Sequence, residues 1–110
     1  MKALLAFIAE QDGRLIDAGG SSSETERVLA RMVKIGEEFG ELCDAVLASQ
    51  GDQRQEKLEA GGGKDELAKE FADVIITTLL LARTMDIDIE QALETKIAKI
   101  RARTVAKKAR

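Results

Sequence analysis

Residues 28–46 read VLARMVKIGEEFGELCDAV, and their pattern indicates how the chain folds. Its apolar residues recur at alternating steps of four and three, which is the period of a helix with one buried face. Residues 64–85 repeat that spacing. Two long amphipathic helices are therefore expected to pack against each other through these stripes. The stripe residues are Val28, Met32, Ile35, Phe39, Leu42 and Val46 in the first helix, and Leu67, Phe71, Val74, Thr78 and Leu81 in the second.

The rest of the chain extends this pattern to an all-α bundle of about four helices in one domain, residues 1–110. The spacing predicts helices over 1–17, 24–49, 64–85 and 89–106, with a break at Asp12-Gly13 in the first. Glycine-rich stretches predict flexible loops near 18–24 and 51–63, the second with one helical turn at 53–59. A serine before residue 24, or Thr25, is expected to cap the second helix, and Asp88 the fourth.

Apolar residues outside the stripes point to a partner surface. Ile76, Leu79 and Leu80 lie on other faces of the third helix, and a monomer of four helices would expose several of them. We therefore expect oligomerisation to complete the bundle. The alternative is that the first or last helix buries these residues within one chain.

Composition and charge exclude several classes of protein. Hydrophobic residues make up 45%, which argues against disorder, and the single Cys43 allows no internal disulfide. The first apolar run is too short for a signal peptide, and none reaches the roughly 20 residues of a membrane span. A soluble cytoplasmic protein is expected. Residues 96–110 carry seven basic and no acidic side chains. Because a helix C-terminus favours cations, we prefer a solvated or phosphate-facing helix end to a nucleic-acid arm.

Acidic residues flank both stripes at the same place. On a helical wheel, Glu38 and Glu41 border the first stripe, and Glu70 and Asp73 border the second, with Glu37 further round. Antiparallel packing would bring the two pairs to one space, where carboxylates repel one another unless a cation compensates. Because the chain has no His, Mg²⁺ or Mn²⁺ with a phosphorylated ligand is favoured over zinc. The alternative is a set of solvated acids beside a helix core.

The motif Glu37-Glu38-Phe39-Gly40-Glu41, followed by Glu70-Phe71-Ala72-Asp73, resembles the EExxE…ExxD signature of the MazG-like nucleotide pyrophosphohydrolases, over about residues 26–103. The resemblance implies hydrolysis of nucleoside triphosphates to monophosphate and pyrophosphate with Mg²⁺, for which Mn²⁺ can substitute, by dimers or tetramers. It implies that Glu38, Glu41, Glu70 and Asp73 bind metal. Glu37 and Glu38 would be catalytic, with Glu37 orienting water or binding a further metal, and Lys96 and Arg103 would contact phosphates.

The chain departs from the family pattern where the base and phosphates bind. Ile100 stands where members often have Asn, and Trp, Tyr and His are absent. If a base is bound, Phe7 or backbone and aliphatic contacts must hold it. The expected role is house-cleaning of the nucleotide pool, with base and sugar undetermined. One alternative is a phosphoribosyl-ATP pyrophosphohydrolase, although relatives of that kind often carry a Tyr-His pair after the ExxD aspartate, where this chain reads Ile75-Ile76-Thr77-Thr78. Another is a helical regulatory or interaction module without catalysis.

Overall fold

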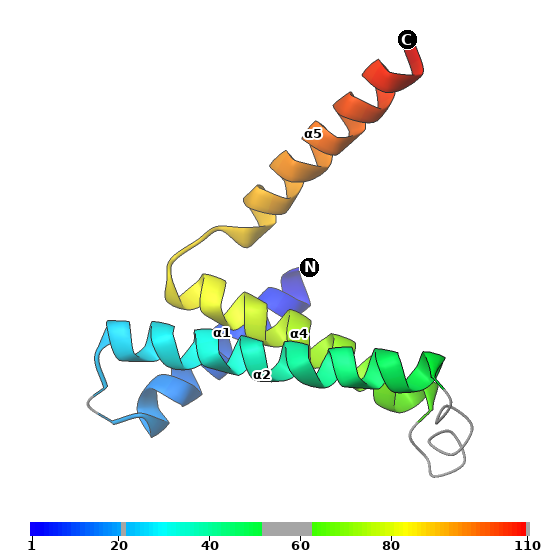
Figure 1. Ribbon diagram of the computed structural model, residues 1–110. Helices are drawn as coiled ribbons and strands as arrows, with labels where there is room; N and C mark the ends of the chain where they lie inside the picture. Colours follow the sequence, from blue (N-terminus) through cyan, green and yellow to red (C-terminus); the bar gives the residue numbers. More distant parts are fainter. Residues whose placement is uncertain (21, 52–62, 110) are drawn as a thin grey trace.

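The computed structural model describes residues 1–20, 22–51 and 63–109, and within them the chain is helical with no strand (Figure 1). The all-α prediction is confirmed, and the helix bounds lie close to those expected. The helical turn suggested at 53–59 lies outside the described residues. The helices are α1 Lys2–Ala18, α2 Glu24–Gln50, α4 Lys64–Thr84 and α5 Ile89–Ala109.

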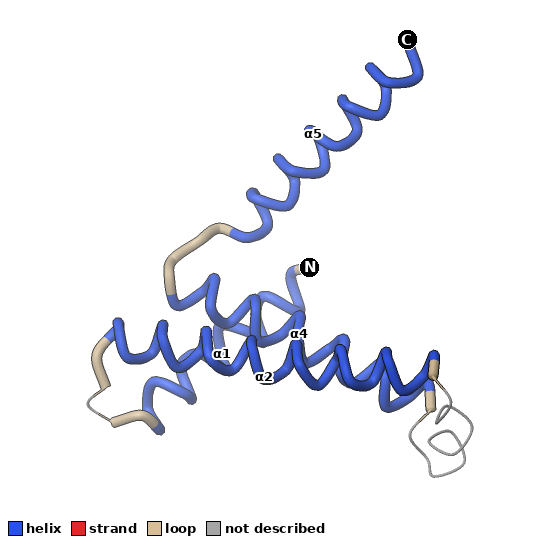
Figure 2. Tube along the Cα trace, in the orientation of Figure 1, coloured by secondary structure: helices blue, strands red, loops and turns tan. Residues whose placement is uncertain are grey.

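Three helices form the body of the molecule, and the fourth projects from it. α2 and α4 run antiparallel side by side and share the largest interface, while α1 packs across α4 (Figures 1 and 2). α5 leaves the end of α4 and points away, so that every residue from 91 to 109 is exposed. None of the helices in the described segments is both long and apolar enough to cross a lipid bilayer.

Polar side chains cap the starts of α2 and α5. Ser23 forms a capping box with Glu26: its Oγ accepts the Glu26 amide at 3.1 Å, and Glu26 Oε1 accepts the Ser23 amide at 3.4 Å. Asp88 Oδ1 accepts the Gln91 amide at 3.0 Å and so caps α5 as expected. Between α4 and α5, Asp86 adopts a φ of 56°, a left-handed conformation that Asp tolerates better than most residues.

The predicted break at Asp12-Gly13 is wrong, because α1 continues through both residues. An Asp side chain weakens a helix when it accepts hydrogen bonds from nearby backbone amides and so competes with the helical hydrogen bonds. Here the Asp12 carboxylate forms an ion pair with the buried Arg31 of α2, so it does not compete for backbone donors. Gly13 costs the helix about 1 kcal/mol, which the packing of α1 on α4 outweighs.

The core lies between α1 and α4. It comprises Ile8, Leu79 and Leu80, with Leu4, Ile76 and Ile89 packed against it. The expectation that Ile76, Leu79 and Leu80 form a subunit interface is therefore wrong: α1 covers this face of α4 within the chain. The stripe residues Met32, Phe39 and Phe71 are instead exposed. The buried face of α2 is rotated from its apolar stripe toward Arg31 and Glu38.

Candidate functional site

Three carboxylates meet where α2 and α4 run side by side. Glu38 and Glu41 are one helical turn apart on α2, and Glu70 faces them from the antiparallel α4. One oxygen from each lies within 4.8 Å of the other two. Glu38 is only 7% exposed, Glu70 is half-buried and Glu41 is exposed. The cluster thus runs from the interior of the helix pair to its surface.

Two oxygens of this cluster are buried without a hydrogen-bond partner in the described chain. They are Glu38 Oε2 and Glu70 Oε2. Buried carboxylate oxygens are normally satisfied, because an unpartnered one loses its hydration without compensation. Hard divalent cations such as Mg²⁺ take carboxylate oxygens as ligands. The donor set and its two unpartnered oxygens therefore fit such an ion.

Lys34 is the cation that pairs with the cluster in the described chain. Its Nζ lies 3.1 Å from Glu38 Oε1 and 3.4 Å from Glu37 Oε2, and these carboxylates raise the pKa of Lys34, Glu38 most strongly. Lys34 thus pairs with one oxygen of Glu38, and the other oxygen has no partner in the described chain. The pKa of Glu41 is raised, first by the charge of Glu38, then by partial desolvation and by the charge of Glu70. The cluster repels added negative charge and would attract a cation.

The remaining residues predicted for the site lie outside the three-carboxylate cluster. Asp73 is exposed, one turn after Glu70, and lines the same pocket as Glu38, although the three-carboxylate group does not include it. Glu37 is exposed beside Lys34. Lys96 and Arg103 lie on the projecting part of α5, and neither lines the pocket (Figure 1). A single chain therefore brings together the acids of α2 and α4 but not the cations of α5.

A pocket of about 690 Å³ opens beside the cluster, between α1, α2 and α4. Glu38, Lys34 and Asp73 lie at one end of it. The other end is formed where α1 leads into α2. Most of the wall between them is apolar, as in many small-molecule sites. The lining residues are Phe7, Gln11, Leu15, Gly19, Ser22, Glu26, Arg27, Ala30, Arg31, Lys34, Glu38, Asp73, Ile76, Thr77 and Leu80.

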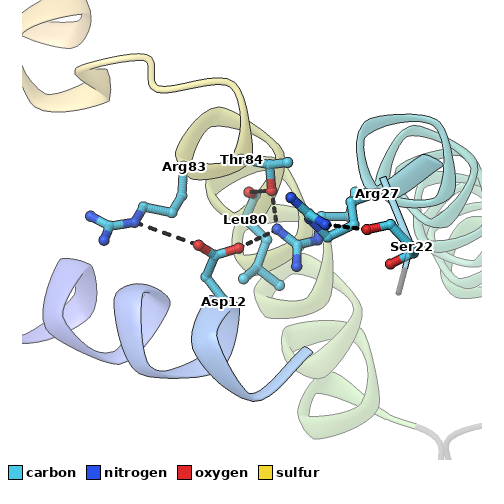
Figure 3. Close-up of polar contacts among 7 residues, drawn as sticks. Asp12, Ser22, Arg27, Leu80, Arg83 and Thr84 are labelled. Carbon is cyan, nitrogen blue, oxygen red and sulfur yellow. Dashed lines mark hydrogen bonds and ion pairs between the residues drawn. The ribbon is translucent and has the colours of Figure 1, made fainter. Parts of the chain in front are cut away.

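A buried ion pair holds α1 in place as one wall of this pocket. Arg31 Nη1 of α2 donates to Asp12 Oδ1 of α1 and to Thr84 Oγ1 of α4. Arg83 Nε lies 3.7 Å from the second Asp12 oxygen, so the carboxylate has a cation on either side (Figure 3). Sequence reasoning missed this network. The available signal was the position of Arg31 on the wheel, beside Glu38 and toward the apolar stripe.

Comparison with protein families finds the MazG nucleotide pyrophosphohydrolase domain over residues 26–106. Comparisons with curated proteins and with solved structures gave no match. The matched segment contains α4 and most of α2 and α5, and with them the whole carboxylate cluster, whereas α1 lies outside it. Since this match covers most of the chain and agrees with its acidic motif and helical fold, the chain belongs to the MazG nucleotide pyrophosphohydrolase family.

Proposed function

We propose that the chain is a Mg²⁺-dependent nucleoside triphosphate pyrophosphohydrolase that converts a (d)NTP and water to (d)NMP and pyrophosphate, with a house-cleaning role in the nucleotide pool. The observation that carries this proposal is the pair of buried, unpartnered oxygens of Glu38 and Glu70 beside Glu41, where Glu38 also lines a pocket large enough for a nucleotide. Family membership supplies the reaction class.

In this proposal Glu38, Glu41 and Glu70 hold the metal, and Asp73 joins them from the pocket wall. When bound, Mg²⁺, or Mn²⁺ in its place, neutralises phosphate charge and lowers the pKa of water, which is the help that phosphoanhydride hydrolysis needs. Glu37 accepts the proton of the attacking water, since it is exposed beside the cluster and outside it. Without metal, Lys34 balances part of the charge of Glu37 and Glu38 through its ion pairs with them.

The substrate-binding roles of Lys96 and Arg103 require a homo-oligomer. Both residues lie on the part of α5 that projects from the three-helix body, so they reach a phosphate chain only if α5 packs against another copy. Exposed apolar side chains on three helices supply the contact surface for a dimer or tetramer. They include Met32, Val33, Phe39 and Leu47 on α2, Phe71 and Ile75 on α4, and Leu93, Ile97 and Ile100 on α5.

The test is pyrophosphate release from a panel of dNTPs and NTPs, each with Mg²⁺ and with EDTA. Metal-dependent release from one or two nucleotides is expected, and Glu38→Gln should abolish it. Glu94→Gln, which removes an exposed acid on α5, is the matched control. Release that persists in EDTA would contradict the metal assignment. Absence of release from every nucleotide would favour phosphoribosyl-ATP as substrate or a non-catalytic module.

Thermal unfolding separates metal binding from catalysis. At a Mg²⁺ concentration of 100 times its Kd, a protein that binds the ion only when folded gains about 2.7 kcal/mol. Glu38→Gln should lose this gain while its metal-free form is at least as stable as the parent, because a buried charge facing other carboxylates is removed. A variant that keeps the full Mg²⁺ response would contradict the role of Glu38.

A further inference from the structure

The end of the pocket farthest from the carboxylate cluster contains a cation, Arg27, whose hydrogen-bonding capacity is incompletely used. Arg27 Nη1 donates to the Ser22 carbonyl at 2.6 Å, and this bond fixes the guanidinium against the link between α1 and α2 (Figure 3). Arg27 Nε is buried and has no acceptor in the described part of the chain. No described carboxylate lies within ion-pair distance of Arg27 either.

Arg31, one turn further along α2, lines the same pocket, and unlike Arg27 it has a charged partner. Its charge is matched by the buried carboxylate of Asp12, and Thr84 provides a second acceptor. Arg31 therefore needs no ligand. Arg27 has only the neutral carbonyl of Ser22, and arginine donates hydrogen bonds but accepts none. A buried arginine donor without an acceptor indicates that a bound molecule, or water, supplies an oxygen there.

The position of Arg27 identifies which part of a nucleotide this would be. Arg27 and Glu38 are eleven residues apart on α2, which corresponds to about 16 Å along the helix. The wall between them is largely apolar, with Phe7 contributed by α1 and Ile76 and Leu80 by α4. If the phosphates bind at the acidic end, as the proposed function requires, the base lies along this wall with its outer edge toward Arg27.

We propose that Arg27 determines base specificity by donating to a keto oxygen on the outer edge of the base. Uracil, thymine, hypoxanthine and guanine carry a keto oxygen where cytosine and adenine carry an amino group. An amino group is itself a donor, so it leaves Arg27 unsatisfied, and a site built around an unused donor discriminates strongly against such a ligand. Gln11, from the α1 wall of the pocket, can donate or accept at the neighbouring ring nitrogen.

The test compares matched nucleotide pairs. We expect kcat/KM for dUTP to exceed that for dCTP, and that for dITP to exceed that for dATP, by about tenfold to a hundredfold, the usual range for a hydrogen bond to a charged donor. Arg27→Met should bring both ratios close to one. Arg27→Lys, which keeps the charge but not the planar donor set, should give ratios in between. Arg14→Met, an exposed arginine on α1 outside the pocket, should leave the ratios unchanged.

Calorimetric binding of dUMP, dCMP, dIMP and dAMP separates this inference from the proposed function, because it needs no turnover. A keto preference in binding that Arg27→Met removes, without hydrolysis of any triphosphate, would support the inference and contradict the proposed function. Hydrolysis with equal kcat/KM for keto and amino bases would support the proposed function and contradict the role of Arg27. A parental keto preference that survives in both Arg27→Met and Arg27→Lys would overturn the role of Arg27. If Arg27→Met fails to fold, Arg27→Lys decides alone.

Discussion

Replacing Asp12 with Asn tests whether α1 is locked onto the body by a buried ion pair. The side chains of Arg31 and Asp12 are 10% and 13% exposed, and they contact each other directly. The asparagine side chain would keep an oxygen acceptor but not the charge, so Arg31 would remain buried beside two neutral groups. Removing one partner of such a pair costs about 3–5 kcal/mol. Because one acceptor is retained, we expect about 3 kcal/mol for Asp12→Asn.

The contribution of Arg83 does not change this magnitude. Its side chain is 57% exposed and its Nε is 3.7 Å from Asp12, so its attraction is screened by water. A domain of this size has a total stability of about 5–15 kcal/mol, of which 3 kcal/mol is a large part. At roughly 4 °C per kcal/mol, the Tm should fall by about 12 °C.

The assay is thermal unfolding followed by circular dichroism, with Asp17→Asn as the control, since Asp17 is an exposed acid on the same helix. A Tm within 2–3 °C of the parent, a shift of less than about 1 kcal/mol, would refute the claim that Arg31 depends on Asp12 for its counter-charge. The double variant Asp12→Leu with Arg31→Met should recover much of the loss, because no unpaired charge remains buried. Asp12→Asn should also weaken nucleotide binding, since α1 forms one wall of the pocket.

Three further predictions concern the cluster and the exposed surface. In the folded chain the pKa of Glu41 is raised above its ordinary 4.5, so in EDTA the folded chain takes up this proton at higher pH than the unfolded chain. The unfolding free energy should therefore rise as the pH falls from neutral through the raised pKa of Glu41. Glu41→Gln should remove this rise in denaturant titrations. Lys34→Met should tighten Mg²⁺ binding in calorimetry, because Glu38 loses a competing cation, and weaker binding would contradict the ion pair as a competitor. Phe39→Lys charges a side chain that is 56% exposed and should shift an oligomer toward monomer in light scattering. Leu29→Lys, nearer the start of α2, should produce a smaller shift if the oligomer contact centres on Phe39.

The fold could be read from periodicity because each helix carries its own local signals. Steps of four and three mark α2 and α4, and the serine and aspartate caps mark where α2 and α5 begin. Which face of each helix is buried could not be read in the same way. The stripe of α2 includes Phe39, yet the structure buries Arg31 and Glu38 and exposes Phe39. The buried Arg31 pairs with Asp12 on another helix, and the spacing of apolar residues within α2 does not encode that contact.

In the candidate site too, local spacing predicted some residues and not others. Glu38, Glu41 and Glu70 were predicted to converge because an i, i+3 pair and an antiparallel neighbour determine that geometry, and the structure brings them together. Lys34 and Arg27 were missed, since a lysine or an arginine on a helix is ordinarily a solvated residue. Their roles depend on what faces them: Glu37 and Glu38 in one case, and an incomplete set of acceptors in the other.

Burial alone does not separate the structural charges of this chain from the functional ones, but the completeness of their partners does. Asp12 and Arg31 are buried and satisfy each other, so they stabilise the fold and require nothing more. Glu38 is as deeply buried, and Lys34 satisfies only one of its oxygens. A leucine at position 38 would remove that cost and extend the apolar contact of α2 with α4. A sequence that keeps a charge in such a place breaks a local rule of stability, which is what a binding site requires and a core does not. The same argument applied to Arg27, whose Nε lacks an acceptor in the described chain, supports the proposal that one ligand spans the pocket from Glu38 to Arg27.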